Sequence, residues 1–289
     1  MTGGGARKAL VTMAIGDRYA RLFETHCRAN WGAYANRHGY DLIVFDRPLD
    51  VSPRAQARSP AWQKCLIAES DDTRGYERIV WVDADILINP DAPSIVECVP
   101  EAKVGAVDAY GMPTPAVYRD ILARQYARWR RAGVAFVDNL TPDAFYQAWG
   151  LPEAPGGEDR VAQTGVLVMT PSLHRDLFKR VYDSYEEKGG AEWNFEMRPL
   201  SWELVRAGLV HWLDWRFNLV VSDIFAWHYP FLADNIFRPF EATNPREVTG
   251  LMNRLVMNAC LRTAFANAWF LHFAGQQSLM DVFAEGGNA

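Results

Sequence analysis

The chain has 289 residues, of which 49% are hydrophobic and 22% are charged, so it is long enough for one large or two small domains with a sizeable core. Its formal net charge of −5 disfavours nucleic acids and anionic membranes as general partners, because both require a basic surface. The four cysteines lie far apart, without the paired spacing of a zinc site or the density of a disulfide framework.

The N-terminal segment is rich in glycine and lacks the apolar core of a signal peptide. No apolar run has the length of a membrane span. We therefore expect a cytoplasmic protein without a membrane span or a nucleic-acid partner, with flexible ends at 1–6 and 284–289.

The first half of the chain alternates short apolar strands with helices. Residues 9–15 and 40–45 predict strands, and the apolar spacing over 18–37 predicts a helix between them. Such a strand–helix–strand unit predicts a parallel sheet, whose ligands gather at the carboxyl ends of its strands. Further elements follow a polar loop at 51–59: a helix at 60–69 and strands at 76–82 and 103–107. This alternation predicts an α/β fold with a mostly parallel central sheet flanked by helices.

The second half continues the alternation but contains two less regular regions, 112–160 and 222–258. The first holds a predicted helix at 118–132 and a candidate strand at 133–137. Five arginines on this helix favour a solvated face over an acceptor-binding role. The aromatic content of both regions leaves room for a homodimer contact. The other predicted elements are strands at 161–169, 209–213 and 268–273, and helices at 171–185, 196–206 and 248–259.

The most informative stretch is the apolar run at 79–82, which leads straight into Asp83 and Asp85. In extended backbone this spacing turns both carboxylates to one face. Two adjacent negative charges are costly unless a cation lies between them, and hard divalent cations prefer carboxylate oxygens. The pattern favours a metal site. The alternative is a turn whose polar residues cap a helix that begins near residue 90.

Four stretches of the chain resemble, in their order, the metal-dependent retaining glycosyltransferases of the GT-A fold. The similarity is to the glycogenin and galactinol synthase group and to the xyloglucan xylosyltransferase and fungal α-galactosyltransferase group. The stretches are VTM with GDRY within 11–19, WQK and WVDAD at 62–64 and 81–85, QTGVLV at 163–168, and LHFAG at 271–275. The resemblance implies one GT-A (Rossmann-like) domain over 7–283, with acceptor-side or oligomerisation insertions at 112–160 and 222–258.

The resemblance also implies a metal centre. Asp83 and Asp85 match the DXD motif that holds a divalent cation against the donor diphosphate, and His272 matches the third ligand. Taken alone, a histidine on an apolar strand is more often a core residue. Two carboxylates and one imidazole suit manganese better than calcium, so Mn²⁺ (or Mg²⁺) is the expected cofactor.

The expected donor is a nucleotide diphosphate sugar, with a UDP-sugar as the leading candidate, and the acceptor is a small molecule, a glycan or a protein. The resemblance also implies donor-binding residues. For Met13, Ile15 and Tyr19, plain core packing is the alternative, and Lys64 is equally compatible with a solvated helix face. Gly275 would let backbone amides approach the diphosphate. The full donor set is Met13, Ile15, Tyr19, Lys64, Asp83, Ala84 and Gly275.

The catalytic residues that the resemblance implies are carboxylates near the sugar. Glu196 aligns with the start of a family helix that carries an acidic residue and a glutamine, but Met197 replaces that glutamine. Glu158 and Asp159 match acidic donor-sugar contacts, with a solvated loop as the alternative. Because the leaving phosphate itself can remove the acceptor proton, the family requires no protein base.

Two other classes of function stay open. The Met197 departure permits a catalytically degenerate nucleotide-sugar-binding protein. The second class is a metal-dependent hydrolase or a sugar nucleotidyltransferase on a similar α/β sheet. A nucleotidyltransferase would have a glycine-rich basic loop after its first strand, and Ile15 to Tyr19 is a poor example. The aromatic residues Trp227 and Tyr229 are candidates for stacking on an acceptor sugar.

Overall fold

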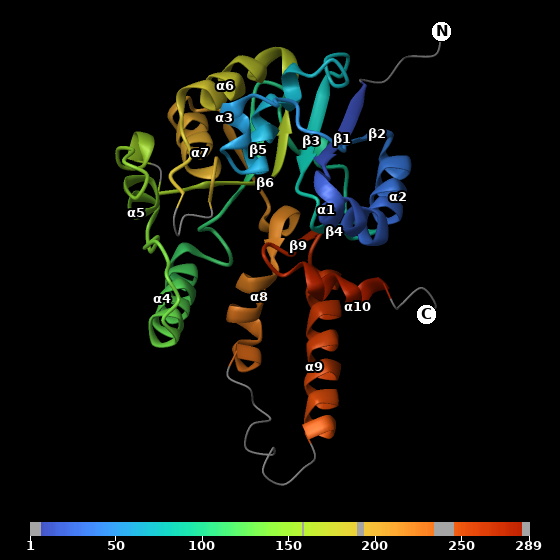
Figure 1. Cartoon of the computed structure of the whole chain (residues 1–289), viewed down its shortest axis with the longest axis vertical. Coiled ribbons are helices and arrows are strands. Elements are labelled where there is room, and N and C mark those ends of the chain that lie inside the picture. Colours follow the sequence, from blue (N-terminus) through green and yellow to red (C-terminus); the bar gives the residue numbers. More distant parts are fainter. Residues whose placement is uncertain (1–6, 158, 190–193, 234–245, 285–289) are drawn as a thin grey trace.

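The structure is a computed structural model that describes residues 7–157, 159–189, 194–233 and 246–284 (Figure 1). Its centre is a six-stranded sheet with the order β2-β1-β3-β6-β5-β7. The strands are β1 (Lys8–Met13), β2 (Tyr40–Phe45), β3 (Arg78–Val82), β5 (Val104–Asp108), β6 (Ala162–Met169) and β7 (Val210–Leu213). Only β6 runs antiparallel to its neighbours, β3 and β5. The predicted α/β fold with a mostly parallel central sheet is confirmed.

The central strands are buried on both faces, as continuous apolar runs require. In β3, Val80 and Val82 belong to one core, whereas Ile79 and Trp81 belong to the other. Successive side chains of a strand point to opposite faces, so one apolar strand supplies both layers.

Helices cover both faces of the sheet (Figure 1). The first core is closed by α1 (Gly16–Leu22), a π-helical segment (Phe23–Cys27) and α2 (Arg28–His38). The predicted helix at 18–37 is therefore present, with one π-helical turn inside it. The second core is closed by a 3₁₀-helix (Pro60–Glu69), α6 (Pro171–Ser184) and α7 (Met197–Arg206).

A second, three-stranded sheet lies beside the first and has the order β4-β9-β8. It consists of β4 (Ile86–Ile88), β9 (Phe270–His272) and β8 (Leu219–Val220). In its register Ile86 and Val220 both pair with His272. The small sheet therefore brings together three segments that are far apart in the sequence. Asp85 precedes β4, Asn218 precedes β8, and His272 ends β9.

Helix α4 (Pro115–Ala132), α8 (Val221–His228) and α9 (Arg246–Asn267) extend from the same side of the sheet (Figure 1). The α4 helix has clear local signals: the Thr114 hydroxyl accepts a hydrogen bond from the Val117 amide, and Gly133 ends the helix with φ 69°. No helix in the described part of the chain is long and apolar enough to span a bilayer.

Three local predictions are wrong. Residues 133–137 form no strand, because they follow the left-handed end of α4 and the Phe136 ring stacks on Tyr126, 4.6 Å away. Residues 222–228 are helical, within α8, rather than irregular, whereas the helix predicted at 248–259 is present within α9, and 234–245 lie outside the described residues. The loop at 51–59 contains α3 (Pro53–Gln56), which Ser52 caps.

The remaining elements are short. They are α5 (Pro142–Gln147), α10 (Asp281–Ala284) and 3₁₀ turns at Ile95–Cys98, Pro155–Gly157, Trp215–Asn218, Pro230–Ala233 and Gln277–Met280. The predicted flexible ends lie outside the described residues, apart from Ala284, which is helical.

Candidate functional site

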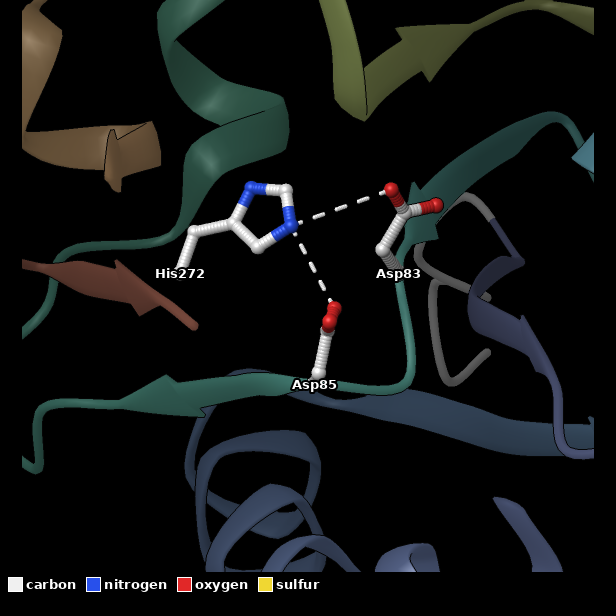
Figure 2. A group of neighbouring side chains, drawn as sticks. All are labelled: Asp83, Asp85 and His272. Carbon is white, nitrogen blue, oxygen red and sulfur yellow. Dashed lines mark ion pairs between the residues drawn. The ribbon is translucent and has the colours of Figure 1, made fainter. Parts of the chain in front are cut away.

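Asp83, Asp85 and His272 meet beside the carboxyl end of β3 (Figure 2). Asp83 and Asp85 lie in a turn between β3 and β4, not in the extended backbone that the sequence predicted. The turn is held from two sides, because the Asp83 amide donates to the Gly165 carbonyl at 2.8 Å and the Phe273 amide donates to the Asp85 carbonyl at 2.9 Å. Tertiary hydrogen bonds, rather than strand alternation, bring the two carboxylates together.

Each of the three side chains directs one atom toward a common point. His272 Nε2 lies 3.3 Å from Asp85 Oδ1 and 3.9 Å from Asp83 Oδ2. The other oxygens are used within the protein: Asp85 Oδ2 accepts from Gln277 at 2.8 Å, and Asp83 Oδ1 accepts from Trp81 Nε1 at 2.9 Å. One candidate ligand atom per residue remains, and the three atoms lie within 4.8 Å of one another.

The orientation of His272 is set by Asn218 and Gln163. Nδ1 of His272 lies 2.9 Å from Asn218 Oδ1, and the Asn218 amide donates to Gln163 Oε1. Since Asn218 uses its NH₂ group on Gln163, its carbonyl oxygen must accept from the Nδ1–H of His272. In the neutral tautomer this leaves the Nε2 lone pair facing the carboxylates, as in metal-binding histidines. The donor set fits a divalent cation.

Gly165, at the start of β6, makes room for the imidazole. A Cβ at this position would lie 2.7 Å from His272 Cε1 and 2.9 Å from Gln163 Oε1. These distances are shorter than van der Waals contacts permit. The absence of a Cβ at this position therefore leaves the space that the imidazole occupies.

Charges compete with burial at this site. Burial opposes the charged form of His272, but the Asp85 and Asp83 carboxylates together outweigh burial and raise the pKa of the imidazole. Burial likewise opposes ionisation of Asp85, yet His272 and the Gln277 amide lower the pKa of that carboxyl. Both shifts favour a charged pair, in which a proton occupies the position that a metal ion would take.

Lys64 is a buried ammonium that is fully paired. Its Nζ lies 3.1 Å from Asp83 Oδ1, 2.9 Å from Glu196 Oε1 and 3.2 Å from the Thr164 carbonyl. These partners use all three of its N–H donors. Burial lowers the pKa of Lys64, but the two carboxylates outweigh burial and raise it. Burial raises the pKa of Glu196, and the Lys64 charge opposes that shift. Lys64 therefore fixes Asp83 and neutralises Glu196.

The site opens into a cavity of about 800 Å³. Every candidate donor residue lies on its wall, as do the three candidate metal ligands and Glu196. Tyr19 is 38% exposed there, and Gly275 has φ 69°. The candidate donor residues on the wall are Met13, Ile15, Tyr19, Lys64, Asp83, Ala84 and Gly275.

Other predicted residues lie elsewhere. Asp159 is exposed and is not among the described residues of the wall, although its charge acts on the cavity residue Asp108. Glu158 lies outside the described residues. Trp227 and Tyr229 pack against the first core instead of the cavity.

Several residues at the site have no signal in the sequence. Asn218 and Gln277 have no motif of their own, and they contact residues 54 and 192 positions away in the chain. The cavity also continues along α4, where Tyr118 and Trp129 line it. The spacing of apolar residues along that helix was the one available signal.

Comparisons with known proteins show the fold. No family model and no curated protein matches the chain. The structure of the bifunctional glycosyltransferase WbbM is 12% identical with a TM-score of 0.56, over 99% of this chain and 51% of that chain. A glycosyltransferase involved in glycosylation of the major capsid of PBCV-1 is 13% identical with a TM-score of 0.48, over 94% and 98%. The galactosyltransferase LgtC is 14% identical with a TM-score of 0.43, over 97% of each chain.

The likeness to WbbM shows that this chain has the fold of a glycosyltransferase structure. The chain spans about half of WbbM, whose two activities belong to that protein. The comparison does not distinguish the glycogenin and galactinol synthase group from the xylosyltransferase and galactosyltransferase group.

Proposed function

We propose that this protein is a metal-dependent, retaining glycosyltransferase that moves a sugar from a UDP-sugar to an acceptor hydroxyl. The observation that carries the proposal is the convergence of Asp83 Oδ2, Asp85 Oδ1 and His272 Nε2 on one point of the cavity wall. The fold shared with WbbM supports the same class of reaction.

The charge of the cavity gives a physical reason for a cation. Among the described residues of the wall, Lys64 and His272 are the cationic side chains, and both already face carboxylates. A nucleotide diphosphate would be repelled by these acids unless a divalent ion screened them. The carboxylates of the wall are Asp83, Asp85, Asp108, Glu196 and Asp223. We therefore propose Mn²⁺ or Mg²⁺ at the Asp–His cluster.

In the proposed reaction the bond between the sugar C1 and the diphosphate oxygen breaks, and a bond forms from C1 to the acceptor oxygen on the same face. The acceptor proton passes to an oxygen of the leaving diphosphate, so no protein base is needed. A divalent cation bound at the cluster would supply Lewis-acid stabilisation of the departing diphosphate. Asp83, Asp85 and His272 would hold it, with Asn218 keeping the imidazole in the required orientation.

The other residues would position the donor. Met13, Ile15 and Tyr19 offer an apolar and aromatic surface for the base. Glu196 is the proposed carboxylate on the sugar side, where Lys64 and Thr164 hold it at 2.9 Å each. Asp159 is the second proposed sugar contact. These roles require a rigid wall, and the buried hydrogen bonds of Glu196 provide one.

The test is incubation of the protein with Mn²⁺, a panel of nucleotide sugars and a panel of acceptors. We expect transfer from one or more UDP-sugars, slow hydrolysis of the same donor without acceptor, and loss of both activities in Asp85→Ala. The matched control is Asp91→Ala, because Asp91 is exposed and follows the same segment. Nuclear magnetic resonance of the product establishes whether the anomeric configuration is retained.

A second candidate function rests on Met197, which lies on the cavity wall and cannot donate a hydrogen bond to a sugar. A catalytically degenerate protein would bind a nucleotide sugar in the presence of Mn²⁺ without turnover on any acceptor. Formation of a nucleotide sugar from a nucleoside triphosphate and a sugar phosphate would instead identify a nucleotidyltransferase. Unchanged turnover in Asp85→Ala would refute the metal assignment.

A further inference from the structure

The cavity has a second end, whose lining residues differ from those proposed for the donor and the metal. We call it the aromatic end, and the cluster of Asp83, Asp85 and His272 the Asp–His end. Four of the residues that define the aromatic end come from α4, one from the segment after β5 and one from α5. They are Tyr110, Tyr118, Leu122, Tyr126, Trp129 and Phe145.

The α4 residues form one stripe, because positions three or four apart lie on the same face of a helix. Arg119 and Arg124 lie on another face and are exposed, so the predicted solvated face is also present. The rings of the stripe pack against other rings. The ring centroids of Tyr118 and Tyr110 are 5.2 Å apart, and those of Trp129 and Tyr126 are 5.7 Å apart. The aromatic end is thus a preformed surface on which a flat apolar group can stack.

The charges on the wall of this end disfavour an anionic ligand, and the nearest buried cation, Arg198, lies behind the wall, 4.3 Å from the centre of the Phe145 ring. No lysine or arginine occurs among the described residues that line the cavity here, whereas Asp108 and Asp223 do. Asp108 accepts hydrogen bonds from the Tyr110 and Val161 amides and lies 3.9 Å from Arg160. A phosphate or carboxylate on a ligand would therefore meet acids and find no counterion on the described wall.

Asp223 lines the cavity and interacts with a residue of each end. It lies in the first turn of α8, and its charge acts on Tyr118 of the aromatic end, while His272 of the Asp–His end acts on it. Its carboxylate accepts a long hydrogen bond, 3.4 Å, from the Ser222 hydroxyl. Burial raises the pKa of Asp223 to about 7, so near neutral pH this carboxyl both donates and accepts hydrogen bonds. It is placed to bind a ligand hydroxyl.

We propose that the aromatic end is the acceptor site and selects an uncharged acceptor with a flat apolar ring beside its reactive hydroxyl, which Asp223 binds. This inference rests on the proposed function and names its acceptor class. Both a sugar ring and an aryl group present such a face, and a stacked ring would leave the hydroxyl between Asp223 and the Asp–His end. An acceptor with a phosphate near the hydroxyl is expected to bind more weakly.

The test uses matched acceptors with the full chain, Mn²⁺ and the active donor. The acceptors are phenyl and methyl glycosides of glucose and galactose, and the corresponding 6-phosphates. We expect both neutral glycosides to bind, and a KM at least tenfold higher for the phosphates. A lower KM for the phenyl than for the methyl glycoside identifies an aryl group as the stacked ring, and equal values identify the sugar.

Three variants locate the site. Trp129→Ala is expected to raise the acceptor KM about five- to tenfold while the donor KM and Mn²⁺ affinity stay unchanged. Leu122→Lys adds a cation to the stripe and is expected to lower the KM for the 6-phosphates, a gain that misfolding cannot produce. Arg124→Ala changes the exposed face of α4 and is the matched control. A shift in donor KM without a shift in acceptor KM would overturn the assignment.

Binding without turnover separates this inference from the proposed function. Saturation-transfer measurements with the neutral phenyl glycosides need no donor. If they show ring contacts that Trp129→Ala removes, the site stands even when no donor is consumed. If no neutral glycoside receives saturation from the protein, or if the 6-phosphates bind equally well, the inference is wrong.

Discussion

The Asp–His end and the aromatic end of the cavity are built from different parts of the fold. The Asp–His end lies where strands meet: β3 ends before Asp83, β6 begins beside it, and β9 carries His272. Its carboxylates have hydrogen-bond donors within the protein: Lys64 donates to Asp83, and Gln277 donates to Asp85. The aromatic end is made by one helix, α4, and the segments that pack on it.

This difference has a chemical meaning. Rigid strands with complete hydrogen bonding hold ligand atoms to within the tolerance that a metal requires, and helices outside the sheet are free to vary in side chain. Under the proposed function, the reaction would take place at the sheet edge and α4 would select the acceptor. Changes at the Asp–His end should affect every acceptor, whereas changes at the aromatic end should affect acceptors selectively.

The largest expected effect is that of Lys64→Met, which tests how strongly the Asp–His end depends on its buried charges. Removing the ammonium leaves Glu196 and Asp83 without their cation, so we expect a loss of roughly 3–5 kcal/mol in the free energy of unfolding. Urea titration followed by circular dichroism measures it.

The control is Lys179→Met, which breaks the exposed pair with Asp183 and should change the free energy of unfolding by less than about 1 kcal/mol. Adding Glu196→Gln to Lys64→Met should recover part of the loss. Equal stability of Lys64→Met and the wild type would show that the buried pair is not needed.

The next effect is on metal affinity. His272→Ala removes a ligand atom, so the affinity for Mn²⁺ should fall by more than the roughly 10–100-fold that loss of an outer partner costs. Calorimetry or electron paramagnetic resonance measures the affinity. His174→Ala is the control, because His174 is equally buried and belongs to no ligand cluster of the described residues. A normal metal affinity in His272→Ala, with a stability loss like that of His174→Ala, would make His272 a core residue.

Gly165→Ala tests the steric fit of His272 at the Asp–His end, with a smaller expected effect. The added methyl would overlap His272 Cε1 and displace the ring, at a cost of about 1–3 kcal/mol in stability and with a lower Mn²⁺ affinity. Gly32→Ala is the control, since a Cβ there meets nothing within 4 Å in helix α2 and should be neutral or stabilising. Thermal unfolding with and without Mn²⁺ distinguishes the two. An undisturbed metal affinity in Gly165→Ala would refute the steric argument.

The smallest effect is the pH dependence of metal binding. The pKa of His272 is raised above its ordinary value of about 6.5, so the imidazole is protonated up to a higher pH and must lose that proton to bind an ion. We expect Mn²⁺ affinity to rise with pH from about pH 6 until the raised pKa is passed, with release of up to about one proton. Calorimetry in buffers of different ionisation enthalpy counts the proton. The same count in His272→Gln would assign it to another group.

Much of the fold follows from spacing in the chain. The alternation of apolar strands and helices predicted the sheet, and the apolar run before Asp83 predicted a buried strand that ends at an acidic pair. The sequence predicts extended backbone at Asp83 and Asp85, but the structure has a turn there. Local spacing does not reveal this turn, because the hydrogen bonds that hold it, to Gly165 and from Phe273, come from distant segments. The helix over 118–132 was predicted together with its exposed arginines, but the face that lines the cavity was not.

By itself, the sequence determined the class of fold and the two adjacent carboxylates, because strand and helix periods and the spacing of Asp83 and Asp85 are local properties. Resemblance to a family added His272. Only the tertiary structure decided which groups orient that histidine and which face of α4 meets the cavity. Asn218 contacts His272 because β8 pairs with β9 in one register, and that register depends on the packing of the whole chain.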